Sequence, residues 1–451
     1  MSATAPGTWV NWAGNQVAEN VTRWHPGSAD EIAAALGEAA AAGRRVRPVG
    51  SSHSFTGIAR PDPATATGPG AVQLELDRHA GVVGLDTGRG LVTVLAGTTL
   101  HQLNLALEVA GLAMTNLGDI DRQTIAGATS TGTHGTGAAF GGLSTQIHGL
   151  ELVLADGSVL ACSPERHPDV FAAARVGLGA LGVVSSLTLK VVPLFAMAAD
   201  ERPMGLEETL ERFDEMADGT DHVEFYWFPH TRTTSVKRNT RLPEGSALRP
   251  LPRWREWWDD EFLSNAVFGG VVGLGRRAPS TVPPLARVAA RALGARTFTD
   301  VSHRVFTSPR RVRFKEMEYA VPRADLLGVL REIVAAVEAS DLRISFPVEV
   351  RVAAADDIPL STAAGRDSGY IAVHVPARVE HEPYFGLVER IAGEVAGRPH
   401  WGKLHTLDAA VLRTRYPRFE EFTRLRDRLD PGGLFRNSHL DQVLGVPGAA
   451  P

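Results

Sequence analysis

A glycine- and serine-rich turn carrying one histidine follows a strand-like run near the start of the chain. The turn consists of Val49, Gly50, Ser51, Ser52, His53, Ser54 and Phe55, and the run before it reads Arg-Val-Arg-Pro-Val. Glycine permits a sharp bend, so successive N–H groups can converge on an anion while the serine hydroxyls add donors. The turn is therefore a candidate phosphate-binding loop, although an ordinary turn is the commoner use of such residues.

A second stretch of small and hydroxylated residues lies at 127–137 and contains no side chain larger than histidine. Such residues cannot pack a core, but they allow a flat ligand to approach the backbone closely. Two such elements in one region indicate a dinucleotide. A flexible surface loop is the alternative interpretation.

A literal G-x-G-x-x-G motif lies at residues 177–182. The nicotinamide fingerprint requires a strand, then the glycines, then a helix. Here a helix-like segment at 168–175 precedes the glycines and a strand-like run at 183–191 follows them, so we exclude that interpretation. The chain also lacks a Walker lysine motif, H-E-x-x-H and G-x-S-x-G.

Two charged residues alternate with valines at 346–352, which reads Phe-Pro-Val-Glu-Val-Arg-Val. On a strand the three valines would face a core, while Glu349 and Arg351 would share the other face. From the spacing alone, a solvated strand face or a surface salt bridge is the commoner reason for such a pair.

The composition limits the function classes. Of 451 residues, 44% are hydrophobic and 22% are charged, which is typical of globular domains. The formal net charge of -5 gives no electrostatic reason to expect a nucleic-acid partner. A lone cysteine, Cys162, permits neither an internal disulfide nor a multi-thiolate metal site, so we predict no metal site and a reducing compartment.

The first twelve residues lack the pattern of a signal peptide, and no apolar run approaches the roughly 20 residues of a membrane-spanning helix. We therefore expect a soluble, cytoplasmic protein without an integral membrane segment. One stretch, 249–313, combines many arginines with Trp254, Trp257 and Trp258. We interpret it as a solvated domain edge or a docking face for an acidic electron acceptor.

The pattern of elements predicts an α+β fold with two domains and a C-terminal segment. An alanine-rich helix near 30–43, with Ser28 as its N-cap, lies over a mixed sheet. Pro193 is a plausible domain exit, after which strand-like runs alternate with helices such as 324–338. The predicted boundaries are 1–193, 194–395 and 396–451.

Several segments together resemble the FAD-dependent sugar-lactone and alditol oxidoreductases of the vanillyl-alcohol-oxidase type. The resemblance covers nearly the whole chain and rests on five runs: 47–55, 117–137, 349–351, 400–403 and 430–437. Gulono- and arabinono-1,4-lactone oxidases or dehydrogenases are the most similar members. The resemblance implies a PCMH-type FAD-binding domain at 1–193, a substrate (cap) domain with a mixed or antiparallel sheet flanked by helices, and a C-terminal segment that contributes to the flavin site.

The resemblance also implies the cofactor FAD, with His53 joined covalently to the flavin C8-methyl carbon. A neutral imidazole is nucleophilic near neutral pH, which suits this bond. The implied cofactor-binding residues are Val49, Gly50, Ser51, Ser52, His53, Ser54, Gly118, Asp119, Thr124, Gly127, Ala128, Ser130, Val184 and His400.

On the substrate side, the resemblance implies catalytic roles for Glu349, Arg351 and Lys403, and substrate contacts from these residues and from Asp119 and His374. Hydride would pass from a CH–OH group of a sugar-1,4-lactone to flavin N5. The group that takes the hydroxyl proton stays open among Glu349, His374, Lys403 and solvent.

Two positions bear on acceptor and substrate. Gly118 stands where relatives that react poorly with oxygen carry alanine, which favours O₂ as acceptor, although a quinone or cytochrome-like acceptor stays open. Asp119 departs from the serine of alditol oxidases, which disfavours a linear polyol. The remaining alternatives are an alditol oxidase, a lactone hydrolase and a flavin-binding protein without turnover.

Overall fold

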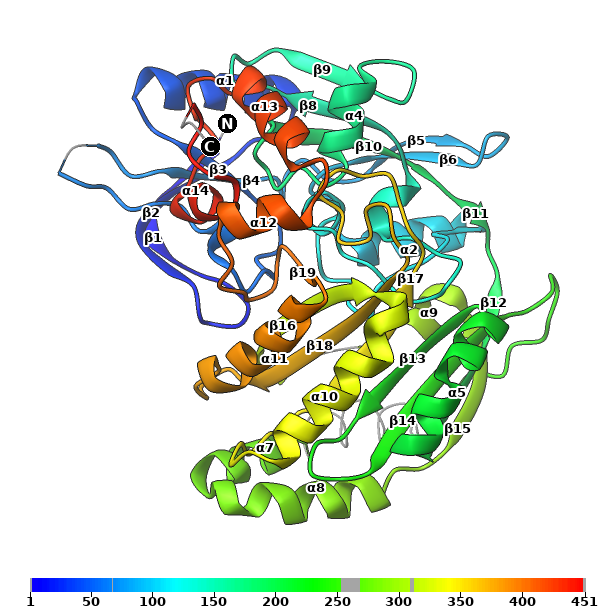
Figure 1. The fold of residues 1–451 in the computed structure, drawn as a ribbon. Helices are drawn as coiled ribbons and strands as arrows, with labels where there is room; N and C mark the ends of the chain where they lie inside the picture. The colour runs from blue at the N-terminus through cyan, green and yellow to red at the C-terminus, as the bar shows by residue number, and fades with distance from the viewer. Residues whose placement is uncertain (1, 67, 253–267, 309–311, 449–451) are drawn as a thin grey trace.

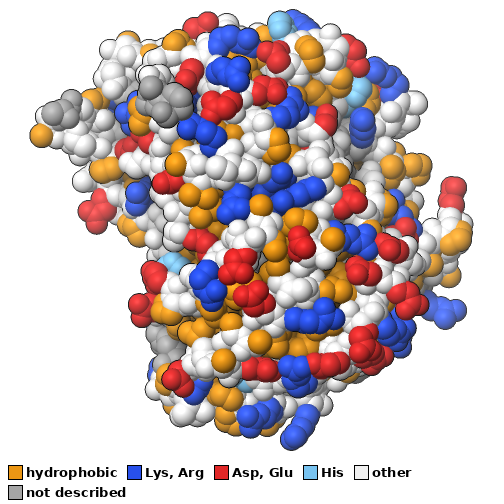
Figure 2. Space-filling view, in the orientation of Figure 1, with side chains coloured by type: hydrophobic (Ala, Val, Ile, Leu, Met, Phe, Trp, Pro, Cys, Tyr) orange, Lys and Arg blue, Asp and Glu red, His pale blue; other side chains and the backbone are white. Residues whose placement is uncertain are grey.

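The computed structural model describes residues 2–66, 68–252, 268–308 and 312–448. Trp254, Trp257 and Trp258, with much of the arginine-rich stretch, lie outside these ranges. Helices and sheets are both abundant, which confirms the predicted α+β class (Figure 1). No helix in the described ranges combines the length and apolar character that crossing a bilayer requires. On the face shown in Figure 2, acidic and basic side chains are interspersed.

The N-terminal half contains three sheets. A four-stranded sheet has the order β1 (Ser2–Val10), β2 (Val17–His25), β4 (Val72–Glu75), β3 (Val46–Val49). An antiparallel five-stranded sheet has the order β5 (Val82–Asp86), β6 (Leu91–Leu95), β10 (Val183–Lys190), β8 (Ile147–Val153), β9 (Val159–Cys162). A small pair joins β7 (Leu112–Ala113) to β11 (Val192–Pro193).

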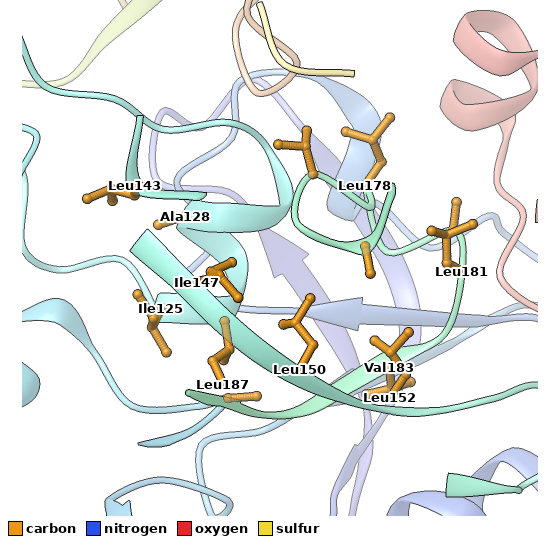
Figure 3. Packing of buried hydrophobic residues seen from close by; sticks show 14 of the residues in the cluster. Ile125, Ala128, Leu143, Ile147, Leu150, Leu152, Leu178, Leu181, Val183 and Leu187 are labelled. Atoms are coloured by element: carbon orange, nitrogen blue, oxygen red, sulfur yellow. The ribbon is translucent and has the colours of Figure 1, made fainter. Parts of the chain in front are cut away.

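Four helices pack with these sheets: α1 (Ala29–Ala41), α2 (Leu100–Val109), α3 (Ile125–Ser130) and α4 (Pro168–Ala174). The predicted cap of α1 is confirmed, because the Ser28 side chain accepts a hydrogen bond from the Glu31 N–H. Figure 3 shows the core between α3 and the five-stranded sheet, where Ala128, Ile147 and Leu150 belong to one buried cluster. The glycines at 177–182 connect α4 to β10, so the reversed element order is also confirmed.

A fourth sheet, antiparallel and of eight strands, dominates the rest of the chain. Its order is β15 (Arg296–Val301), β12 (Ala196–Gly205), β14 (Thr233–Arg241), β13 (His222–Trp227), β17 (Val348–Ala353), β18 (Ser368–Pro376), β16 (Phe314–Pro322), β19 (Arg398–Pro399). Helices α5 (Leu206–Gly219), α10 (Leu326–Glu338) and α11 (Glu382–Glu394) cover one face (Figure 1).

The alternation predicted for β17 is confirmed. Val348, Val350 and Val352 are fully buried in the core beneath these helices. Because successive side chains of a strand point to opposite faces, Glu349 and Arg351 project from the other face of the sheet.

Further helices lie at both ends of the large sheet and at the C-terminus (Figure 1). They are α7 (Phe268–Arg277), α8 (Val282–Arg291), α9 (Ser302–Phe306), α12 (Ala409–Arg415), α13 (Phe419–Leu429) and α14 (Ser438–Leu444). Short 3₁₀ helices occupy Gly57–Ala59, Leu143–Gln146, Pro279–Thr281 and Arg323–Asp325. Helices α12 to α14 pack on the N-terminal half, where Phe419, Phe422 and Phe435 join its core. The exact domain boundaries stay a prediction.

A buried arginine on β3 connects two segments of the N-terminal half with the C-terminal segment. Arg47 is 2% exposed, and its guanidinium donates to the backbone oxygens of Leu178, Gly179 and Phe435 at 3.0, 3.2 and 2.7 Å. Burial lowers the pKa of Arg47 to about 10, so the side chain is still a cation at neutral pH. It therefore holds the turn after β3 against the glycine run and the C-terminal segment.

Replacing Arg47 with Met leaves three buried carbonyl groups without their donor. Each such group costs about 1–3 kcal/mol, so we expect a clear fall in the free energy of unfolding in urea. Arg45→Met is the matched control, because Arg45 is partly exposed and its pair with Asp62 at 3.4 Å is of the surface kind that contributes at most about 1 kcal/mol. Equal losses in both variants would contradict the role of Arg47.

Candidate active site

Two cavities meet at the histidine of the first loop. The first cavity encloses about 840 Å³ of empty space and the second about 2280 Å³, both partly open to solvent. His53, Ser54, Gln123 and Thr131 line both of them. A ligand that fills the first cavity and extends past His53 therefore reaches the second.

The structure brings nearly all predicted site residues to these two cavities. The first cavity is lined by Val49, Gly50, Ser51, Ser52, His53, Ser54, Thr124, Gly127, Ser130 and Val184. The second is lined by Gly118, Asp119, Glu349, Arg351, His374, His400 and Lys403. Ala128 lines neither, because its methyl group points into the core on the other side of α3.

The first cavity has the features of a phosphate cradle. At Gly50 an added Cβ would lie 2.3 Å from Thr124 Oγ1, so only glycine permits this approach of the turn to α3. In the described ranges, no protein group accepts a hydrogen bond from the N–H groups of residues 51–54. With the Arg47 cation in the same wall, these free donors fit a pyrophosphate, and hence a dinucleotide such as FAD.

Sequence reasoning missed one wall of the first cavity. Leu178, Gly179 and Gly182 line it, although the motif they belong to does not follow a strand. Gly179 has a φ of +62°, and an added Cβ would lie 2.9 Å from the Arg47 guanidinium. Three glycines within six residues were the available signal, and only the element order argued against a nucleotide role.

His53 stands where the two cavities join, with its ring stacked on Trp12 at 5.8 Å between ring centres. Burial lowers the pKa of His53. The ring is therefore neutral near neutral pH, which is the nucleophilic form of imidazole.

In the second cavity, Arg351 is surrounded by carboxylates. Its guanidinium contacts Glu349 and lies 3.3 Å from oxygens of both Asp119 and Glu224. The Tyr226 hydroxyl donates a hydrogen bond to Glu349 Oε1 at 2.8 Å. Burial alone would lower the pKa of Arg351, but the three carboxylates raise it well above its ordinary value. Arg351 is thus a permanent donor.

Lys403 is held between two buried carboxylates. Its Nζ lies 2.6 Å from Glu316 Oε1 and 2.9 Å from Glu318 Oε2. Burial would lower the pKa of Lys403, but both carboxylates raise it above its ordinary value. Burial would raise the pKa of Glu316, yet Lys403 and His374 bring it down to about 2. Lys403 therefore stays protonated and is a donor rather than the base, which leaves Glu349, His374 and solvent as proton acceptors.

Two further histidines line the second cavity. His134 Nε2 faces Glu318 Oε2 at 3.1 Å and its Nδ1 faces the Gly135 carbonyl at 2.8 Å, so each ring nitrogen lies within hydrogen-bond distance of an oxygen. His400 accepts a hydrogen bond on Nδ1 from the Gly402 N–H, and burial lowers its pKa to about 3, so it is neutral.

Glu316, Glu349 and His374 place oxygen and nitrogen atoms within 4.8 Å of one another, which is the spacing of metal ligands. The Lys403 ammonium, however, lies 2.6 Å from Glu316 Oε1 and would repel a metal cation at that atom. We therefore assign no metal to this cluster.

Sequence reasoning missed several polar residues of this site, namely Glu224, Tyr226, Glu316, Glu318 and His134. The signal was present for four of them. On β13 and β16, as on β17, polar residues alternate with residues of the core such as Phe225 and Met317. Only the sheet order shows that these strands present their polar faces to one cavity.

Comparisons with known proteins agree with this geometry. A family model described as D-arabinono-1,4-lactone oxidase matches residues 187–443, and one described as FAD binding domain matches residues 24–163. The chain belongs to the D-arabinono-1,4-lactone oxidase family. It is an FAD-dependent oxidoreductase, as the resemblance read from the sequence predicted.

Relatives in this family match over almost their full length. L-gulono-1,4-lactone dehydrogenase of Mycobacterium tuberculosis is 43% identical over 437 residues, which cover 97% of this chain and 99% of the relative. Bovine L-gulonolactone oxidase is 33% identical, with coverage of 96% and 97%. Alditol oxidase of a Streptomyces species is 31% identical, with coverage of 96% and 98%.

The fold is shared with solved structures. Cholesterol oxidase from B. sterolicum superposes with a TM-score of 0.79 at 17% identity, covering 98% of this chain and 97% of that one. At this identity the likeness concerns the fold alone. Together with the FAD binding domain model, it confirms the predicted α+β fold with an FAD-binding unit.

Replacing Lys403 with Met leaves Glu316 and Glu318 buried without their shared cation. The pKa of both carboxyls then rises from its lowered value, because burial raises it and only the neighbouring histidines remain to lower it. A folded state that binds more protons gains stability as the pH falls. The variant has a lower free energy of unfolding in urea than the wild type. This difference should therefore shrink as the pH falls from about 7 to about 5, by about 1.4 kcal/mol for each unit by which the pKa has risen.

The wild type should not show this gain. Its two carboxyls have pKa values below the ordinary range, so their stabilisation is fully present above about pH 4.5 and is lost as the pH falls towards about 2. Lys403→Arg, which keeps the cation, is the control. If Lys403→Met loses the same free energy of unfolding at every pH, Lys403 does not set the charge of these carboxyls.

Proposed function

We propose that this protein oxidises a CH–OH group of a sugar-1,4-lactone of the L-gulono or D-arabinono type. The proposal depends on one observation. The first cavity, with its phosphate cradle, and the second cavity, with its permanent donors and acceptors, meet at His53. Bound FAD would supply the hydride acceptor. The relatives named as lactone oxidases and dehydrogenases support the same substrate class.

The polar wall of the second cavity suits a hydroxylated ring. Arg351 and Lys403 are fixed cations that donate to lactone or hydroxyl oxygens, while Asp119 and Glu349 accept from hydroxyl groups. Both cations already neutralise buried carboxylates, so a neutral sugar does not need to bring a charge into the pocket. Glu349, His374 or solvent holds the proton released from the reacting hydroxyl.

An alditol is the second candidate. The alditol oxidase relative supports it, whereas the Asp119 carboxylate, already paired with Arg351 at 3.3 Å, differs from the serine expected for a polyol enzyme. O₂ or another electron acceptor takes the electrons in the second half of the cycle. Gly118 lines the second cavity, and its lack of a side chain supports access for O₂. A cytoplasmic location stays a prediction.

We further propose that His53 carries the flavin covalently, which the neutral, buried ring at the junction of both cavities supports. Acid precipitation of the purified protein should leave the yellow colour in the pellet. His53→Ala should release the flavin into the supernatant, while His101→Ala, a histidine outside both cavities, should not. Flavin in the supernatant of the wild type would refute the linkage.

Glu349→Gln tests the lactone pocket. A hydrogen bond to a charged group contributes about 1.5–3 kcal/mol, so kcat/KM for L-gulono-1,4-lactone should fall roughly 10- to 150-fold. Anaerobic bleaching of the flavin by a panel of lactones and alditols measures this directly. Wild-type flavin that no lactone bleaches would exclude the proposed reaction.

Glu224→Gln is the matched control for this experiment. Glu224 also contacts Arg351, at 3.3 Å, but it does not line the second cavity. Its replacement should cost much less activity than that of Glu349. Equal losses would mean that Glu349 acts through Arg351 instead of touching the substrate.

A further inference from the structure

The second cavity is divided into a polar and an apolar part. Its polar side chains come from the large sheet, from residues 400–403 and from loops of the N-terminal half that carry Asp119 and His134. The rest of the lining includes an apolar compartment, which consists of Leu285, Ala286, Ala289, Leu293, Ile344 and Phe346. A hydroxylated lactone would lose hydrogen bonds on entering this compartment, because apolar walls offer no partners. The sugar therefore belongs to the polar part, and the apolar compartment is left for a different ligand.

Helix α8 supplies one wall of this compartment. Val282, Leu285, Ala286 and Ala289 recur at spacings of three and four residues, so they form one face of the helix. This face lines the cavity, whereas Arg287 and Arg291 are exposed. Among the described residues, Leu285, Ala286 and Ala289 join none of the hydrophobic clusters of the core. The apolar face is thus directed at the second cavity.

Aromatic rings connect the compartment to His53. Trp12 stacks on His53, and its ring centre lies 5.2 Å from that of Phe314. Phe314 in turn lies 5.7 Å from Phe346. Such rings favour a flat, apolar ligand. A ring bound here lies next to the residue that marks the junction of the two cavities.

We propose that the apolar compartment binds a quinone with an apolar side chain, as the electron acceptor of the lactone reaction. This assignment rests on the proposed function, since that reaction requires a two-electron oxidant near the flavin. One lactone loses two electrons and two protons, and one quinone gains two electrons and two protons to become a quinol. The donor takes the polar part and the acceptor the apolar part of one cavity.

Leu285→Asp tests the site by placing a carboxylate in its apolar wall. Titration of the oxidised holoenzyme with decylubiquinone, followed by quenching of tryptophan fluorescence, should give a Kd at least about tenfold higher than in the wild type, because the quinone would desolvate the new charge. Val288→Asp is the matched control. Val288 is on the same helix, is 63% exposed and does not line the cavity, so its replacement should leave the Kd within about twofold.

A second measurement separates this site from the donor site. Enzyme reduced with dithionite under anaerobic conditions is mixed with decylubiquinone or with ferricyanide, a hydrophilic acceptor, so that no lactone is needed. The ratio of the two reoxidation rates should fall at least about tenfold in Leu285→Asp only. Failure of lactones to reduce the flavin would overturn the proposed function and leave this test intact.

Three outcomes would overturn the quinone site itself. One is the absence of quinone binding to the wild type, and another is an equal effect of both aspartates. The third is a loss in Leu285→Asp confined to lactones with apolar substituents, which would assign the compartment to the donor.

Discussion

The burial of the Lys403 ammonium between Glu316 and Glu318 is the interaction on which the site depends. Ions removed from water are stable only when opposite charges and hydrogen bonds replace the lost solvent. Lys403 belongs to the C-terminal segment, both glutamates to β16, and the His134 ring, which lies 3.1 Å from Glu318, to a loop of the N-terminal half. These ions can be buried only if all three parts of the chain assemble correctly.

The same constraint explains how the protein can bind an uncharged, hydroxylated molecule. The buried cations Arg351 and Lys403 of the second cavity already have carboxylate partners. Glu316, Glu349 and Arg351 project into the cavity from strands of one antiparallel sheet. Fixed dipoles and charges of this kind require little reorganisation during a reaction. The lining of the phosphate cradle on the other side of His53 is uncharged apart from Arg47. Its donors are backbone N–H groups, whose positions do not depend on side-chain rotamers.

One cavity with two kinds of wall suits an enzyme that must meet two reactants at one cofactor. Sheet strands provide the polar wall because their alternation separates core residues from cavity residues along the same strand. A helix provides the apolar wall because Leu285, Ala286 and Ala289 join none of the core clusters that the described residues form. The two kinds of wall follow from the different periodicity with which side chains repeat along a strand and along a helix.

The sequence by itself determined the local features: the cap of α1, the alternation on β17, the glycine-serine turn with His53, and the family. These depend on neighbouring residues, whose spacing sets which face a side chain occupies. The tertiary structure alone decided that Glu318 meets His134, that Gly179 lines the first cavity, that Ala128 points into the core, and that the apolar face of α8 is directed at a cavity. Such outcomes depend on strand order and on packing between residues far apart in the chain, and the energy of burying a charge or a methyl group is defined only once those distant partners are in place.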